Sequence, residues 1–218
     1  SRAPQVIADA QASHGDNHVV DDEQVRQVLA RGRARGVPAL PLIPAEHIVQ
    51  IGFTSGSTGS PTAHAKRWGS LHGNTRFNAE RIRECLRATG PATPANIVAT
   101  VPPQHMYGTE TSVLLPLLAG MAVHTARPLF PTDVAVALGE VPEPRVLVTT
   151  PVHLRTLLAS KQSFPKVAVV VSATAPMDAA LAQRVGCGLN APLLEMFGST
   201  ETCVIATRLT AYESGWRL

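Results

Sequence analysis

Short apolar runs alternate with segments of helical periodicity from about residue 48 onward. Buried strands are predicted by the apolar runs at 96–101, 145–149, 166–171, 193–196 and 204–209. Between these runs, apolar residues recur at helical spacing over 111–119, 133–138, 151–160 and 177–185. Strands that alternate with helices predict an α/β fold with a mostly parallel sheet flanked by helices on both faces.

The first 45 residues carry a weaker pattern. Asp21-Asp22 is typical of a helix N-terminus, and Val25, Val28 and Leu29 would share one face of the helix that follows. Prolines at 38, 41 and 44 then indicate an extended connector. We therefore expect a lead segment with one helix over residues 1–45 and a main domain over 46–218.

One apolar strand runs directly into a loop of glycine, serine and threonine. Ile48, Val49 and Ile51 lead to Phe53, and the next residues are Thr54-Ser55-Gly56-Ser57-Thr58-Gly59-Ser60-Pro61-Thr62. Glycines let the backbone approach an anion closely, and the hydroxyls and N–H groups supply donors. A helical pattern leaves the loop, carried by Trp68, Leu71, Thr75, Asn78, Ile82 and Leu86. The order strand, loop, helix predicts a phosphate-binding site.

This loop does not match the common nucleotide-binding motifs. A Walker A loop needs a second glycine where Pro61 stands, and no Gly-x-Gly-x-x-Gly occurs here. The string Phe-Thr-Ser-Gly-Ser-Thr-Gly-x-Pro instead resembles the phosphate loop of the adenylate-forming enzymes, which include acyl- and aryl-CoA synthetases, adenylation domains of peptide synthetases and luciferases. The resemblance implies that phosphates are bound by Thr54, Ser55, Gly56, Ser57, Thr58 and Gly59.

A second stretch, Phe197-Gly198-Ser199-Thr200-Glu201, resembles the Tyr-Gly-x-Thr-Glu motif of the same family. An aromatic face at Phe197 can stack on adenine, and Gly198 lets the chain turn sharply. The resemblance implies that the Thr200 hydroxyl donates to the α-phosphate and that Ser199 lies in the same nucleotide site. It also implies that Glu201 binds Mg²⁺, which takes one or two carboxylates together with phosphate oxygens.

Two further loops correspond to family segments. Residues 172–176, Ser-Ala-Thr-Ala-Pro, stand where the family has a glycine-containing loop that lines the adenine pocket, so nucleotide contacts are expected at Thr174 and Ala175. His105 lies in residues 102–108, which resemble the segment where an aromatic residue or histidine borders the acyl pocket near the phosphates. Ligands bind beyond the carboxyl ends of parallel strands, so these loops are expected to surround one crevice.

The chain departs from the family pattern at one lysine. The family loop continues Pro-Lys, but here Pro61 is followed by Thr62, and a lysine comes only at Lys66. Lys66 either reaches the β- and γ-phosphates from the first turn of the helix or is a plain surface lysine. We expect three other histidines, His64, His72 and His153, to be structural or surface residues.

The resemblance covers residues 48–209 and implies a two-step reaction. A carboxylic acid reacts with ATP to form an acyl-adenylate, and a thiol of CoA or of a carrier protein then takes the acyl group, with ATP and Mg²⁺ as cofactors. Aryl and fatty acids both remain open. The alternative is a non-catalytic nucleotide-binding module that kept the phosphate loops, which the two replaced glycines at 173 and 174 and the displaced lysine favour.

Two parts of the family pattern do not occur within these 218 residues. They are the ribose-binding aspartate, which follows the glutamate-containing loop, and the small C-terminal domain with its catalytic lysine. Residues 46–218 are therefore expected to form a partial AMP-binding domain that binds ATP weakly, has almost no turnover by itself and can self-associate through its open edge.

Composition narrows the possible partners. The chain is 44% hydrophobic and 16% charged, and no apolar run reaches the roughly 18 residues that span a bilayer. Cys85, Cys187 and Cys203 lie far apart without a CxxC spacing, which argues against a disulfide framework or zinc site and is typical of a cytoplasmic protein. The net charge is +3, and scarce aromatic residues argue against a nucleic-acid partner.

Overall fold

The computed structural model describes residues 22–30, 42–55, 61–87, 94–210 and 213–218. Contacts within the chain divide it into two compact units, residues 1–43 with 55–62 and residues 44–54 with 63–218. In the first unit the described helix is α2 (Asp22–Ala30), where the sequence predicts one. Residues 56–60 lie outside the described part, and of Ser55 only the main chain is described. The phosphate-binding roles of Ser55, Gly56, Ser57, Thr58 and Gly59 therefore stay predictions.

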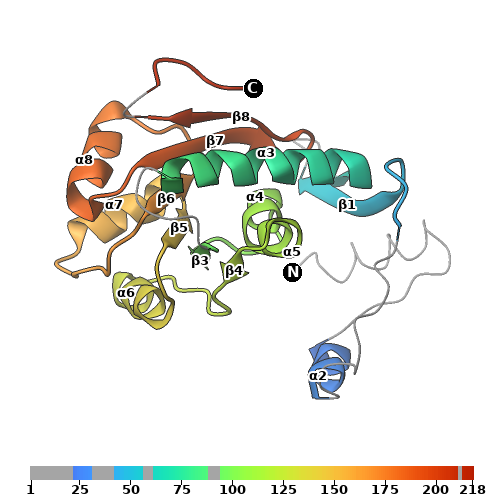
Figure 1. The fold of residues 1–218 in the computed structure, drawn as a ribbon, viewed down its shortest axis with the longest axis horizontal. Helices are drawn as coiled ribbons and strands as arrows, with labels where there is room; N and C mark the ends of the chain where they lie inside the picture. The colour runs from blue at the N-terminus through green and yellow to red at the C-terminus, as the bar shows by residue number, and fades with distance from the viewer. Residues whose placement is uncertain (1–21, 31–41, 56–60, 88–93, 211–212) are drawn as a thin grey trace. The chain divides into compact units, whose positions relative to one another are not determined.

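The second unit is built on a six-stranded sheet of order β4-β3-β5-β6-β7-β8 (Figure 1). Its strands are β3 (Asn96–Ala99), β4 (Ala122–Val123), β5 (Arg145–Thr149), β6 (Val169–Ser172), β7 (Leu193–Ser199) and β8 (Cys203–Leu209). All neighbours pair in parallel except β7 and β8, which are antiparallel. The predicted α/β fold with a mostly parallel sheet is confirmed.

Helices cover both faces of this sheet. One face packs against α3 (Trp68–Arg87), α4 (Met106–Gly108) and α5 (Leu115–Ala119), and the π-helical turn η1 (Thr109–Leu114) packs through Leu114 against Cys203 of β8. The other packs against α6 (Pro131–Glu140), α7 (Pro151–Ala159) and α8 (Ala179–Leu189). Neighbouring strand residues divide between the two cores, as Val146 and Leu147 do on β5. Apolar residues on both faces of a strand produce the continuous runs seen in the sequence.

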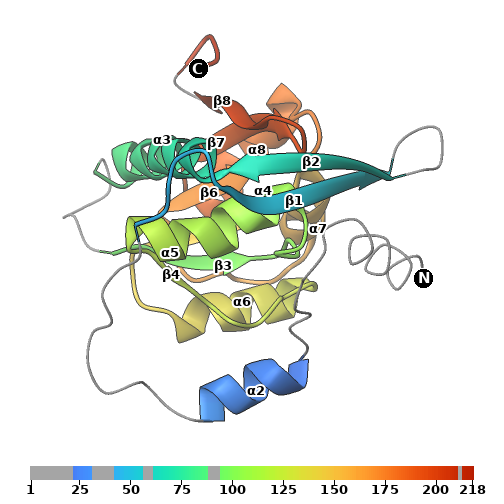
Figure 2. The same cartoon turned by 90° about the vertical axis from the view of Figure 1, so that its right-hand side faces the viewer.

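The described residues on either side of the glycine-rich stretch are two strands rather than a strand and a helix. Strands β1 (Ile48–Ser55) and β2 (Pro61–Arg67) form a separate two-stranded sheet, seen clearly in Figure 2. The prediction that a helix follows the loop directly was wrong, because β2 intervenes before α3. On β2, His64 and Lys66 are more buried than Ala63, Ala65 and Arg67, which is the alternation of a strand with one covered face.

Two element boundaries differ from the prediction and affect the site. Helical structure begins at Met106 rather than at 111, and β7 continues through Phe197-Gly198-Ser199, which the sequence had assigned to a loop. A Cβ atom at Gly108 would collide with the carbonyl oxygen of Pro102, so glycine lets the chain fold back at this point. As a result, residues 102–108 turn tightly over the end of β3.

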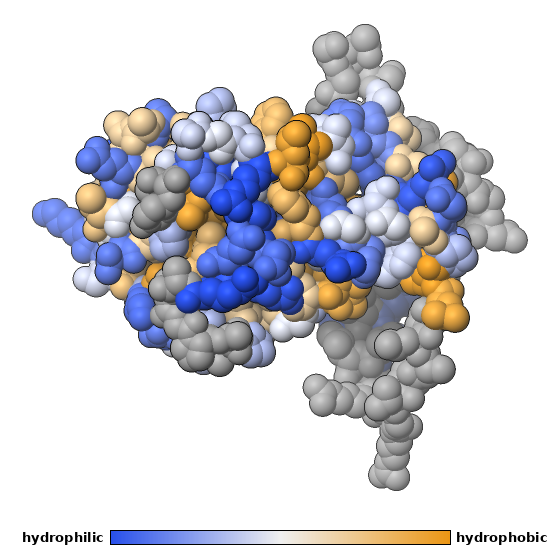
Figure 3. Space-filling view, turned by 45° about the horizontal axis from the view of Figure 1, so that its top comes forward, coloured by the Kyte–Doolittle hydropathy of each residue, from blue (hydrophilic) through white to orange (hydrophobic). Residues whose placement is uncertain are grey.

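Charged residues tie α3 to the last described segment, 213–218. Arg81 is only 4% exposed and donates to the Thr207 hydroxyl at 2.9 Å and to both carboxylate oxygens of Glu213. Figure 3 turns the α3 and β8 side toward the viewer and shows a broad hydrophilic band between hydrophobic residues. Among the described helices, none has the length and apolar character that crossing a membrane requires.

Candidate functional site

Three of the predicted loops meet at one cavity beyond the carboxyl ends of the parallel strands. The cavity measures about 460 Å³, and its lining includes five of the predicted site residues, His105, Thr174, Gly198, Ser199 and Thr200. They come from the loops after β3, β6 and the far end of β7. This is the position at which open α/β sheets bind ligands.

A second cavity of about 590 Å³ shares Thr174 and Gly198 with the first and adds Ala175 and Phe197. The Phe197 side chain is 56% exposed, and its ring centroid lies 5.7 Å from that of Trp216. The Arg208 guanidinium lies 4.7 Å from the Trp216 ring centroid. These flat groups form a surface on which a planar ligand can stack. Sequence reasoning proposed Phe197 for this role and missed Trp216, which has no motif around it.

Thr174 has a backbone conformation that is uncommon for its type. Its φ is +79°, in the left-handed region that glycine adopts freely and that a β-branched residue adopts at a cost. It stands where the family pattern has glycine. The loop therefore keeps a glycine-like backbone after the substitution, and this exposed threonine stores strain at the rim of both cavities.

We expect Thr174→Gly to stabilise the protein. Relief of the left-handed strain contributes about 1–2 kcal/mol, and the greater freedom of glycine in the unfolded chain offsets about 0.5–1 kcal/mol. The measurement is the denaturant midpoint of unfolding. The matched control is Thr125→Gly, because Thr125 is also exposed but has no positive φ, and this variant should be less stable than wild type. A lower midpoint for Thr174→Gly would contradict the argument.

Thr200 and Glu201 lie in the turn between β7 and β8. A Cβ atom at Gly198 would collide with the Cys203 carbonyl oxygen, so only glycine allows the two strands to approach here. The pairing register shifts between Phe197 and Gly198. On the other side, a Cβ atom at Gly52 would lie 3.0 Å from the Thr200 methyl carbon, so β1 packs closely on Thr200.

A histidine connects the first and last predicted motifs. His64 Nε2 lies 3.0 Å from Thr54 Oγ1 and 3.6 Å from a carboxylate oxygen of Glu201. Glu201 is exposed, and the Ser199 hydroxyl, its own backbone N–H, His64 and Lys66 lower the pKa of its carboxyl. His64 was expected to be structural or on the surface. The structure instead places this half-buried side chain between two predicted site residues.

The structure corrects the expected place of Lys66, while its contact with the phosphates stays a prediction. It lies on β2 rather than in the first turn of a helix, and it is only 5% exposed. Its Nζ donates to the carbonyl oxygen of Glu201 at 2.6 Å. The surface alternative is excluded by this burial, and the partners of the ammonium group are the main chain of the predicted metal-binding turn and the Cys203 thiol.

Glu110 is a site residue that sequence reasoning missed. It lies on η1, is 2% exposed and lines the 460 Å³ cavity. Its Oε1 accepts a hydrogen bond from the Val204 N–H at 3.1 Å. Burial raises the pKa of Glu110 to about 7, although that hydrogen bond, Asn78 and the charge of Lys66 act in the opposite direction. An acidic residue at helical spacing from the buried Tyr107 and Leu114 was the signal available in the sequence.

Two histidines border the same cavity. His105 is exposed at the start of α4, as expected for a residue that borders a substrate pocket. His153 also lines the cavity, and its Nδ1 lies 2.9 Å from Thr100 Oγ1. His153 therefore belongs to the wall of the candidate site as well as to the structure of α7.

The donor set of the site fits Mg²⁺ bound together with a nucleotide. The described residues contain no cluster of three or more His, Cys, Asp or Glu that could hold a metal by themselves. Mg²⁺ commonly binds one or two carboxylates plus substrate phosphates, and Glu201 offers one ionised carboxylate next to the Thr200 hydroxyl. Glu201 would hold the ion once the nucleotide supplies its phosphate oxygens, with the Thr200 hydroxyl left to bind the phosphate itself.

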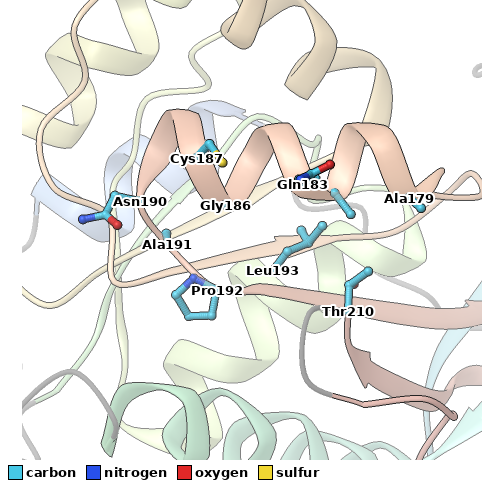
Figure 4. A pocket seen from close by; sticks show the side chains of 10 residues that line it. Ala179, Gln183, Gly186, Cys187, Asn190, Ala191, Pro192, Leu193 and Thr210 are labelled. Atoms are coloured by element: carbon cyan, nitrogen blue, oxygen red, sulfur yellow. The ribbon is translucent and has the colours of Figure 1, made fainter.

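A further cavity of about 470 Å³ lies away from this site, between α8 and the start of β7 (Figure 4). Gln183 and Asn190 are its polar side chains on α8 and just after it, and Thr210 closes the opposite side. None of the predicted site residues in the described part of the chain lines it, so this cavity is separate from the candidate site.

Comparison with known proteins establishes the family. The sequence model described as "AMP-binding enzyme" matches residues 2–216. The chain belongs to the AMP-binding enzyme family. It is 34% identical over 156 residues to a 4-coumarate–CoA ligase of Rhodobacter capsulatus and 32% identical over 188 residues to one of Halorhodospira halophila. These matches cover 71% and 84% of the chain, but only 38% and 43% of the two ligases.

Solved structures of AMP-binding proteins share the fold. An O-succinylbenzoate–CoA synthetase from Bacillus subtilis in complex with AMP gives a TM-score of 0.69 at 18% identity, with 98% of this chain and 45% of that chain covered. ATP-bound MatB from Rhodopseudomonas palustris gives 0.64 at 20% identity, with 86% and 36% covered. The B. subtilis synthetase is also known in complex with ATP and a magnesium ion, at a TM-score of 0.67.

Proposed function

We propose that the protein carrying this AMP-binding chain is an AMP-forming acid–thiol ligase. It joins a carboxylic acid to ATP as an acyl-adenylate and then transfers the acyl group to a thiol. The observation that carries the proposal is the meeting of His105, Thr174 and Thr200 around one cavity, beside the exposed Phe197. The relatives are named CoA ligases, which supports catalysis over a nucleotide-binding module without activity.

The proposed binding roles are divided between residues of the two cavities. Phe197 and Trp216 stack on the adenine, while Thr174 and Ala175 line its edge. Thr200 donates its hydroxyl to the α-phosphate, and Thr54 with the hydroxyl-rich loop binds the outer phosphates. Bound Mg²⁺ offsets phosphate charge, and Glu201 is its protein ligand. Positioning and charge stabilisation of this kind are the main contributions a protein makes to phosphoryl-group chemistry.

The reaction then follows from this placement. An oxygen of the acid's carboxylate attacks the α-phosphorus, the bond to the β-phosphate oxygen breaks, and pyrophosphate leaves. In the second step the thiol gives its proton to solvent, its sulfur attacks the acyl carbon, and AMP leaves with the electrons of the broken acyl–phosphate bond. His105 lies at the cavity wall where the acid must approach. We place the acid in the 460 Å³ cavity and propose an aryl acid, the class named by both ligase relatives.

Thioester formation tests this function. The whole protein should convert ATP, 4-coumarate and CoA to AMP and a CoA thioester, detected by mass spectrometry, and should use a long-chain fatty acid much less well. If a thioester forms on an added carrier protein but not on CoA, the acyl acceptor is a carrier protein, and the proposed reaction class is unchanged. ATP binding with no thioester from any acid would favour the non-catalytic module. We place the reaction in the cytoplasm, where free cysteines such as Cys85 and Cys203 stay reduced.

A further inference from the structure

The turn that carries Thr200 and Glu201 has a strained main chain. Cys203 has a φ of +62°, which is unusual for a residue with a side chain, and the pairing register shifts beside Gly198. Backbone conformations of this kind persist only where the surrounding structure holds them. Glu201 and Thr202 are themselves exposed, so packing of their own side chains does not hold the turn.

Side chains from three other elements hold this segment by its main chain. Lys66 Nζ on β2 donates to the Glu201 carbonyl oxygen at 2.6 Å. Glu110 Oε1 on η1 accepts from the Val204 N–H at 3.1 Å, and Asn74 Nδ2 on α3 donates to the Val204 carbonyl oxygen. The contacts join residues that are between 94 and 135 positions apart in the chain.

The three side chains are connected to one another. Asn78 Nδ2, which is fully buried, donates to Asn74 Oδ1 at 2.9 Å, and an Asn78 side-chain hydrogen bond also reaches Glu110. When Glu110 is ionised, its charge interacts with that of Lys66 across the buried space next to Cys203. Burying ionisable groups is costly even when they are paired, and replacing such a pair by well-packed apolar residues is often neutral or stabilising. The network therefore has a use other than general stability.

We propose that Lys66, Asn74 and Glu110 are positioning residues that aim the Thr200 hydroxyl and the Glu201 carboxylate at the nucleotide. This inference rests on the proposed function, because it assigns those two groups to ATP and Mg²⁺. The three residues act through the main chain of residues 201–204. A shift of about 1 Å in a catalytic group can lower the rate about 100-fold, so a loose turn would be costly.

The test measures ATP affinity of the whole protein by calorimetry, once with Mg²⁺ and once with EDTA, for Lys66→Met and Asn74→Ala. Both variants should weaken ATP binding about tenfold in Mg²⁺ and less than twofold in EDTA. In acid-dependent ATP–pyrophosphate exchange, both should lower kcat and leave the KM for the acid unchanged. Glu110→Leu should behave alike, whereas Glu110→Gln keeps an acceptor for the Val204 N–H and should retain Mg²⁺-dependent affinity. The matched control is Lys161→Met, which removes an exposed lysine.

The outcomes separate this inference from the proposed function. Folded variants with wild-type affinity in Mg²⁺ would overturn the positioning role, as would equal losses in Mg²⁺ and EDTA. Asn74 is half-buried on a helix where alanine is well tolerated, so Asn74→Ala decides the question if Lys66→Met does not fold. If wild type shows no exchange with any acid, the proposed function fails, and the affinity measurements still test the positioning of the turn.

Discussion

Glu201→Gln in the whole protein is expected to lower kcat for acid-dependent ATP–pyrophosphate exchange about 100-fold, with the acid KM changed less than twofold. The substitution keeps the size of the side chain and removes its negative charge. Glu201 is exposed next to Thr200, and the hydrogen bonds from Ser199 and its own N–H, together with His64 and Lys66, lower its pKa, so the carboxyl is ionised at neutral pH. The charge that is lost is the one that we propose faces the nucleotide-bound Mg²⁺.

Steady-state exchange kinetics over a range of Mg²⁺ concentrations would measure this effect. The variant should need more Mg²⁺ for half-maximal rate, because one anionic ligand of the metal is gone. Glu140→Gln is a suitable control, since Glu140 is an exposed glutamate at the end of α6, on the opposite face of the sheet. If Glu201→Gln showed wild-type exchange, Glu201 would be part of the turn but would have no role in the reaction.

The second large effect concerns the pH dependence of stability. Burial raises the pKa of Glu110 from 4.5 to about 7, so the folded protein favours its protonated form. This contribution to the free energy of unfolding is complete below pH 4.5 and is lost as the pH rises toward about 7. Because one pKa unit corresponds to about 1.4 kcal/mol, the loss amounts to about 3 kcal/mol. Lys66, Tyr107 and Cys203 are the titratable groups that interact with Glu110.

Glu110→Gln is neutral at every pH and should lack this dependence. Urea unfolding between pH 4.5 and 8 should show wild type losing stability relative to Glu110→Gln as the pH rises, with most of the change complete near pH 7. Glu80→Gln, at an exposed position on α3, should follow the wild-type curve. Parallel curves for wild type and Glu110→Gln would mean that the Glu110 carboxyl ionises as readily in the folded protein as in the unfolded chain.

Sequence reasoning worked for the central sheet because its strands are buried on both faces. The run at 145–149 predicted β5 at its observed bounds, since each residue from Val146 to Thr149 is buried. It failed for β2, where the covered positions hold His64 and Lys66 rather than apolar residues. Period-two hydrophobicity was therefore absent, and the segment looked like the end of a loop.

For the site, the motifs predicted residues that line the two cavities but not the residues that hold them in place. Phe197, Thr200 and His105 lie in short strings with recognisable spacing. Glu110 and His64 contribute through contacts with residues far away in the sequence, at Val204 and Glu201, and no local pattern records such a contact. Hydrogen bonds between distant side chains and main chain become visible only once the fold brings the elements together.

The proposed function makes one claim that a single measurement can test. Whole protein incubated with ATP, Mg²⁺ and labelled pyrophosphate, without any thiol, should incorporate label into ATP only when 4-coumarate or a related aryl acid is present. Thr200→Val should lose most of this exchange, since it keeps the shape of the side chain and removes its hydroxyl. Exchange that is absent with every acid, or that Thr200→Val leaves unchanged, would contradict adenylate formation at this site.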